Sequence, residues 1–238
     1  LWIDSTAAYQ KETDSKKRKA AKLKAYQSIS DKYPEDLEAQ AFLALAMYNN
    51  VKAKKNYDEV EKLITKVLEK NPMHPCHHYR IHLWDYKDPK RALPSVGLCG
   101  QSAEGIAHMW HMPGHILSRL KRYNDATWMQ EASARVDHAH MMRDQVMPDR
   151  IHNFAHNNEW LTRNLSQAGR VHRALAMAKN MIELPRLPKV KDDGTWSFPS
   201  RSSNSYGRRH LYAILTGYEL WNEVIHLKDT HYLLPGKS

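Results

Sequence analysis

Five short polar segments, each leading into an apolar stretch, recur along the chain and constrain its fold more than any other feature. They read KNYDEV (55–60), KDPKRA (87–92), KRYNDA (121–126), AGRVHRA (168–174) and ELWNEV (219–224). Each ends on a small apolar residue, at positions 60, 92, 126, 174 and 224, so the spacings are 32, 34, 48 and 50 residues. A period of this length is typical of repeat architectures, in which one helical unit stacks on the next.

The apolar residues between these segments recur at intervals of three and four. LEAQAFLALAMY (37–48) and YDEVEKLITKVLEK (57–70) show this pattern clearly, and it is typical of helices with one buried face. The chain has only nine glycines and few alternating β-branched runs, which argues against a sheet. The sequence therefore predicts an all-α fold.

One stretch of the chain resembles the tetratricopeptide repeat (TPR) family. The 34-residue unit of that family carries W-x2-L-G-x2-Y, then Ala, a large apolar residue and Pro. Trp110, Gly114 and Ala126 match this pattern, whereas Pro113 and Leu117 replace the Leu and the Tyr.

An earlier unit carries the second half of the same pattern, with Val60, Ile64 and Pro72 in the Ala, apolar and Pro places. The resemblance covers residues 35–228. It implies an α-α superhelix of TPR-like helix pairs, which is a solenoid with a concave groove. We therefore expect residues 1–238 to form a single TPR-like helical repeat domain that belongs to a longer protein.

Residues 185–205 are rich in Pro, Ser and Lys and are expected to form a long loop. Trp196, Phe198 and Arg201 give this loop side chains with which it could fold back over the groove as a lid. A disordered surface loop is the alternative.

The resemblance also implies which side chains line the groove, because they come from fixed places on the first helix of each pair. Histidine fills more of these places than any other residue type does. The places are taken by His74, His77, His78 and Ile81, by His108, His111, Met112 and His115, by His156, Glu159, Trp160 and Arg163, and by Tyr206, Arg209, His210 and Ala213.

Imidazole is the commonest side-chain ligand of transition metals in proteins. Residues four apart share a helix face, so His111 and His115 can chelate one ion. We expect His77 or His74 and His156 to complete this site, with two separate sites as the alternative. Zinc or copper is the expected ion, and iron is a further candidate. The candidate ligands are His74, His77, His78, His108, His111, His115 and His156.

No H-E-x-x-H, nucleophile elbow or Gly-rich phosphate loop occurs in the sequence. If the groove is catalytic, Glu159 and Asp85 are the candidate acid–base residues. The candidate contacts to a substrate or peptide are Trp160, Arg163, Tyr206, Arg209 and His210.

Two classes of function remain open. The first is a repeat protein whose groove binds a transition metal and forms the active site of a metalloenzyme. The second is an interaction module that binds a peptide or a partner domain in the groove without metal. The expected partners are other domains of the same longer chain or a protein or peptide ligand.

The formal net charge of +10 suggests anionic partners, but much of it comes from KKRKAAKLK (16–24), which is typical of a solvated helix face. The basic residues lack interleaved aromatics, so nucleic acid is not an expected partner. No apolar run approaches the ~20 residues that cross a bilayer. We expect a soluble chain in which Cys76 and Cys99 are buried free thiols.

Overall fold

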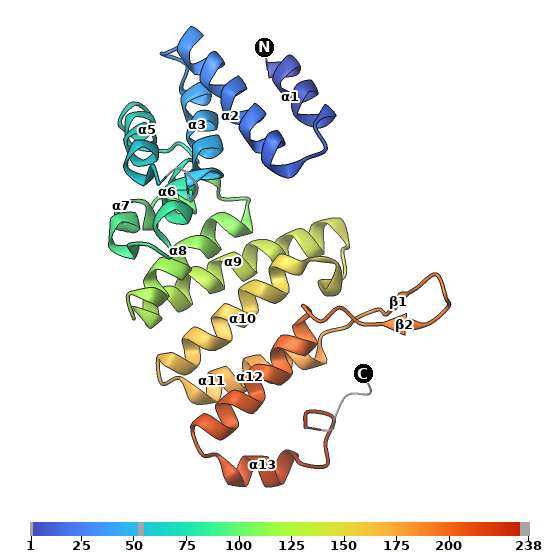
Figure 1. Ribbon diagram of the computed structural model, residues 1–238. Coiled ribbons are helices and arrows are strands. Elements are labelled where there is room, and N and C mark those ends of the chain that lie inside the picture. Colours follow the sequence, from blue (N-terminus) through green and yellow to red (C-terminus); the bar gives the residue numbers. More distant parts are fainter. Residues whose placement is uncertain (1, 52–54, 234–238) are drawn as a thin grey trace. The chain divides into compact units, whose positions relative to one another are not determined.

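The computed structural model describes residues 2–51 and 55–233, and this part of the chain is mostly helical (Figure 1). The predicted all-α class is confirmed, since the described strands are limited to β1 (Lys189–Val190) and β2 (Trp196–Ser197). The helices group into two compact units, Leu1–Ala103 and Glu104–Ser238. Each unit is described by itself.

In the first unit, successive helices pack on one another, and α3 contacts both α5 and α6. Helix α5 shows why these segments are helical, because its buried residues recur at intervals of three and four. Cys76 and Cys99 are buried free thiols, as predicted. The elements are α1 (Trp2–Lys11), α2 (Ser15–Lys32), α3 (Leu37–Tyr48), α5 (Tyr57–Lys70), α6 (His77–Trp84), η1 (Pro89–Ala92), α7 (Leu93–Val96) and η2 (Gln101–Ala103).

In the second unit, each helix packs on the next one, and α10 also contacts α8 and α12. Leucine, isoleucine and alanine side chains of α10, α11 and α12 form its main apolar core, with Leu161, Ala178 and Leu211 among them. The elements are α8 (Ala107–Arg119), α9 (Tyr123–Asp144), η3 (Pro148–Arg150), α10 (His152–Gln167), α11 (Val171–Glu183), the hairpin β1–β2, α12 (Ser203–Gly217) and α13 (Trp221–Leu227).

Four of the five recurring polar segments share one backbone feature. The residue five positions before the small apolar residue has a left-handed φ, which is 54° at Lys55, 59° at Lys121, 74° at Gly169 and 53° at Glu219. In the second unit, the N–H of the next residue donates to a carbonyl five positions earlier. These bonds are Arg122 to Leu117 (2.8 Å), Arg170 to Leu165 (2.9 Å) and Leu220 to Leu215 (2.8 Å). The recurring signal is therefore a Schellman-type helix end.

The small residues after these turns explain the rest of the signal. Val60, Ala92, Ala126 and Ala174 are all 0% exposed, so each new helix packs closely against its neighbour from its first turn onward. The segment at 87–92 differs from the other four, because a 3-10 turn (η1) replaces the left-handed residue.

Segment 185–205 is a loop that contains a short hairpin. Lys189 pairs with Ser197 and Val190 with Trp196 in antiparallel register, and Figure 1 shows the hairpin projecting from the helices of the second unit. Trp196 is 73% exposed, so the lid contact that the sequence suggested for this indole is not made. Phe198 instead packs under the guanidinium of Arg186, 4.0 Å from the ring centroid.

The left-handed turns lead to a stability prediction. Lys121→Gly and Glu219→Gly should each raise the free energy of unfolding by about 0.5 to 1 kcal/mol, because glycine adopts this φ without steric penalty. Urea denaturation followed by circular dichroism measures the change. Lys87→Gly is the matched control in the segment that lacks a left-handed residue, and it should be destabilising or neutral. Equal gains in all three variants would contradict this explanation.

A buried acid in the second unit leads to a pH prediction. Asp137 is 6% exposed and accepts a hydrogen bond from Nδ2 of Asn157 at 2.7 Å. Burial raises the pKa of its carboxyl to about 6, despite the opposing effect of that hydrogen bond. Since this pKa lies above the unfolded value, the contribution of Asp137 to stability falls as pH rises towards 6.

Asp137→Asn should therefore stabilise the protein by about 1 to 3 kcal/mol at pH 8 and by much less at pH 4.5. Urea denaturation of the variant and the parent at both pH values measures this difference. A gain that is the same at both pH values would show that ionisation of Asp137 is not its cause.

Candidate metal centre

Three histidines of the second unit meet where α8 contacts α10. His111 and His115 lie one turn apart on α8, and His156 lies on α10. One ring nitrogen from each residue falls within 4.8 Å of the other two, so the group could hold a metal ion. The Nε2 atoms of His111 and His115 are 2.8 Å apart. Two zinc-bound nitrogens are about 3.3 Å apart, given tetrahedral geometry and Zn–N distances of about 2.0–2.1 Å, so small ring movements would suffice.

The proton on His111 is fixed by Gln130 of α9. Nε2 of Gln130 lies 3.2 Å from the backbone carbonyl of His111, which can only accept a hydrogen bond, so the amide nitrogen must face it. Oε1 of Gln130 then faces Nδ1 of His111 at 2.6 Å, and Nδ1 must be the protonated nitrogen. His111 therefore presents the lone pair of Nε2 to His115, the geometry that a metal ligand needs.

Gly114 leaves room for this amide. A Cβ atom at position 114 would lie 2.2 Å from Nε2 of Gln130, which is far inside van der Waals contact. The sequence suggested Gly114 as a repeat residue, and its close approach to Gln130 gives the physical reason for it. The absence of a methyl group at position 114 thus allows Gln130 of α9 to orient His111 of α8.

His156 is oriented by a carboxylate in the same way. Its Nδ1 lies 3.2 Å from Oε2 of Glu159, one turn further along α10, so Nδ1–H donates and Nε2 carries the lone pair. Oε1 of Glu159 forms an ion pair with Arg209 of α12 and lies 3.7 Å from Nε2 of His210. Burial alone raises the pKa of Glu159, but His156, His210 and Arg209 outweigh this effect and lower it to about 2.

His115 is held by stacking. Its ring lies against the indole of Trp160, with centroids 4.0 Å apart and an interplanar angle of 21°. The guanidinium of Arg163 lies 5.0 Å from the Trp160 ring centroid. Trp160 and Arg163, which the sequence predicted as ligand contacts, therefore also form the wall that supports one of the three histidines.

The environment keeps His111 neutral. Its side chain is 0% exposed and that of His115 is 8% exposed. Burial lowers the pKa of His111 well below 6.5, and the neighbouring His115 and His156 lower it further. Metal binding requires unprotonated imidazole, so no proton has to leave His111 at neutral pH.

Two predicted ligands of the first unit have structural roles instead. Nδ1 of His77 lies 2.9 Å from Oγ of Ser95. Its Nε2 lies 2.8 Å from the backbone carbonyl oxygen of Pro72. Nδ1 of His74 accepts a hydrogen bond from the backbone amide of Cys76 at 3.0 Å. Nε2 of the same ring lies 3.2 Å from Oε1 of Glu38. Hydrogen bonds within the first unit thus engage both nitrogens of each ring, and the part of His77 or His74 in the metal site stays a prediction.

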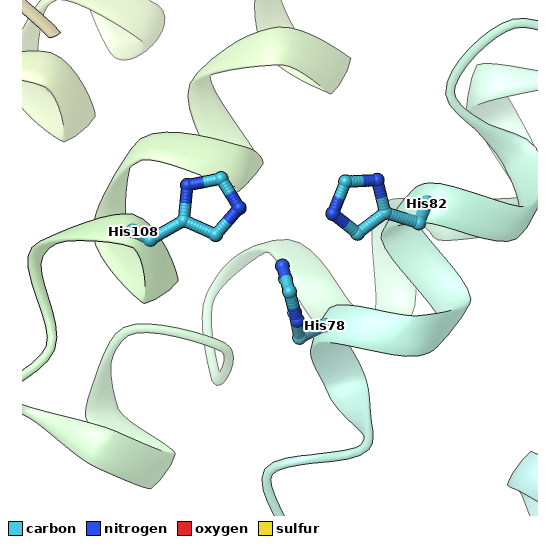
Figure 2. Close-up of side chains that lie close together, drawn as sticks. All are labelled: His78, His82 and His108. Atoms are coloured by element: carbon cyan, nitrogen blue, oxygen red, sulfur yellow. The ribbon is translucent and has the colours of Figure 1, made fainter. Parts of the chain in front are cut away.

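The other two predicted ligands are shown in Figure 2. His78 projects from α6 beside His82, and their rings form a T-shaped pair with centroids 4.5 Å apart. His108 lies on the first turn of α8, and its ring stacks on that of His111 with centroids 5.8 Å apart. In the second unit, His108 thus borders the histidine group without being one of its three members.

Two further predicted site residues are buried. Asp85, proposed as an acid–base residue, is 2% exposed at the end of α6, so a dissolved substrate cannot reach it. Tyr206, proposed as a ligand contact, is 5% exposed and packs with Ala155 and Met181 in a small core cluster. Glu159 is well placed, but a carboxyl with a pKa of about 2 is a weak base at neutral pH. It serves to orient His156.

Sequence reasoning missed Gln130. It lies on the second helix of its pair, at a position that the resemblance does not assign to the groove, and no local pattern distinguishes it from a surface glutamine. The one available signal was Gly114 in the middle of a helix, since such a glycine often marks a close approach.

The chain was also compared with known proteins. No model of a protein family matches the sequence, and no curated protein matches it either. Over residues 2–51 and 55–233, no helix combines the length and the apolar character that crossing a membrane requires.

The support of His111 by Gln130 can be tested by mutation. Gln130→Ala and Gly114→Ala should each weaken zinc binding by about 10- to 100-fold, the usual effect of losing the partner that orients a ligand. Helix content should change little, because the amide that the added methyl group would displace is the far end of a flexible side chain. Isothermal titration calorimetry measures the affinity. Unchanged affinity in both variants would contradict the role given to Gln130.

Proposed function

We propose that the second unit binds a transition metal ion, zinc or copper, through the Nε2 atoms of His111, His115 and His156. One observation carries the proposal: Gln130 and Glu159 accept the Nδ1 protons of two of the three rings. Metal-binding histidines are held in this way in most known sites, with the second nitrogen donating to a carbonyl or carboxylate.

The donor set restricts the ion. Imidazole nitrogen suits zinc, copper, iron and nickel, whereas magnesium and calcium prefer oxygen. Three protein ligands leave one tetrahedral position for water or substrate, which is typical of catalytic zinc sites, since structural sites use four protein ligands. We therefore favour a metalloenzyme centre over a structural metal.

A pocket beside the group supports an anionic substrate. It has a volume of about 570 Å³ and is lined by Glu159, Arg163, Arg209 and His210, among others. Arginine binds carboxylate and phosphate groups through paired hydrogen bonds. Glu159 partly neutralises Arg209, so Arg163 is the stronger candidate for the substrate contact. The metal would polarise the bond that is broken, and the arginines would orient the substrate.

We also infer that the helices of the second unit form TPR-like pairs. Helices α8, α10 and α12, the first members of the pairs, lie side by side, because α10 contacts both of the others. The Schellman-type turns at Lys121, Gly169 and Glu219 recur at the same phase within each pair. This arrangement places the histidine group on the face formed by the first helices, where the resemblance implies a groove.

The direct test is metal binding by protein purified without a His-tag. Isothermal titration calorimetry of chelator-treated protein with zinc should show a tight site that depends on His111 and His115. His115→Ala and the pair His111→Ala/His115→Ala should weaken it by more than about 100-fold, beyond the effect of a lost orienting partner. Binding should also weaken at acid pH, because a protonated imidazole cannot bind a metal ion.

His172→Ala is the matched control, because His172 is an exposed histidine on α11. It should bind zinc like the parent protein. Equal zinc affinity in the parent, the control and the double variant would overturn the proposed site. Circular dichroism of each variant separates loss of the site from loss of the fold.

A further inference from the structure

A second pocket of the second unit lies at the base of the β1–β2 hairpin. Its volume is about 390 Å³, and its walls come from η3, the start of α10, the hairpin and the start of α12. Three cationic side chains line it, namely Arg150, Lys189 and Arg201, against one acidic residue, Asp149. The pocket therefore carries an excess of positive charge at neutral pH.

Two helix N-termini add to this positive potential. Helices α10 and α12 run in the same direction, so that both begin beside the hairpin (Figure 1), and the first residues of each line the pocket. Neither helix has an acidic residue in its first turn, and no side chain caps the amides of α10, whereas the Ser202 hydroxyl caps one amide of α12, that of Ser205. Uncompensated N-terminal amides of long helices attract anions.

Two buried oxygens of the lining residues lack hydrogen-bond partners within the described part of the chain. One is Oγ of Ser203, a residue that is only 7% exposed. The other is Oδ1 of Asp149. The second carboxylate oxygen, Oδ2, accepts a hydrogen bond from the backbone amide of Leu187 at 2.7 Å. Buried polar atoms are almost always paired, so these two indicate a ligand that provides both an acceptor and a donor.

We propose that this pocket binds a phosphate group that carries a proton, either free hydrogen phosphate or the head of a phosphate ester. Arg150, Lys189, Arg201 and the two helix N-termini balance its negative charge. The Ser203 hydroxyl donates to one phosphate oxygen, and Asp149 accepts the P–O–H proton. The proposal is independent of the metal centre, although His152 lines the pocket and stacks on His156 with centroids 6.0 Å apart.

The role of Asp149 distinguishes phosphate from sulfate. Hydrogen phosphate and sulfate are both tetrahedral and divalent, but at neutral pH free phosphate still carries a proton and sulfate carries none. A phosphate ester keeps its last proton only at or below its second pKa of about 6. An ionised carboxylate repels an oxygen that has no proton and accepts a hydrogen bond from one that has. Asp149 therefore makes the pocket selective for the protonated ion.

Isothermal titration calorimetry of the chelator-treated full chain with inorganic phosphate and with sodium sulfate tests the proposal without metal. Phosphate should bind with 1:1 stoichiometry and at least about 10-fold more tightly than sulfate, as expected for one charge-assisted hydrogen bond. Methyl phosphate at pH 6 tests the ester as the source, and either phosphate compound bound above sulfate supports the site.

Variants of the lining residues complete the test. Arg201→Gln and Ser203→Ala should weaken phosphate binding, the former by about 10-fold or more. Asp149→Asn should bind sulfate more tightly than the parent does, so that the preference for phosphate shrinks. Lys191→Gln is the control, because it removes a charge from the same hairpin without lining the pocket.

Equal affinities of the parent for phosphate and sulfate would overturn the proposal. Equal weakening by Lys191→Gln and Arg201→Gln would overturn it as well, because general surface charge would then explain the binding. Zinc affinity should stay unchanged in all four variants, so that failure here is distinguishable from failure of the metal centre.

Discussion

The histidine group that could hold a metal ion depends above all on the hydrogen bonds between Gln130 and His111. Both side chains are 0% exposed, and an unpaired polar group at that depth costs about 1–3 kcal/mol. Because the amide bonds both the ring and the backbone carbonyl of His111, it can sit in only one orientation. That orientation fixes the His111 tautomer, and through it the lone pair that Nε2 of His111 turns towards Nε2 of His115. This position of the Gln130 amide requires glycine at position 114, since a Cβ atom there would overlap with Nε2 of Gln130.

The charges around the three histidines favour an anion as the further ligand of a bound metal ion. Glu159 and Arg209 neutralise each other, and the three imidazoles are neutral when they bind metal. A divalent ion would therefore bring an uncompensated charge into a largely buried site. Uncompensated charge at that depth is unfavourable, so an anion at the open position would strengthen the complex. The pocket with Arg163 and Arg209 beside the group is consistent with an anion that enters from that side.

Sequence reasoning predicted the helices and the turns well, because both depend on neighbours within a few residues. The recurring segments are mostly helix ends with a left-handed residue, and the small residue after each turn is buried wherever the next helix packs closely. The site was predicted only in part. The i, i+4 spacing was enough to place His111 and His115 on one face, whereas His74 and His77 belong to a similar histidine cluster but form hydrogen bonds with Glu38, Ser95 and Pro72. Local pattern cannot separate a ligand from a hydrogen-bonded core histidine.

The sequence by itself determined the all-α class, the positions of the turns and the shared face of His111 and His115, since helix geometry fixes each of these over short distances. Only the tertiary structure decided which residues meet that face. His156 arrives from α10, Gln130 from α9 and Arg209 from α12, all of them distant from α8 along the chain. Helix packing sets their register, and it also made Glu159 an orienting carboxylate and placed Asp149 and Ser203 in one pocket. Contacts between distant segments carry no short-range signal, and for that reason the chemistry of this protein appears only in the folded chain.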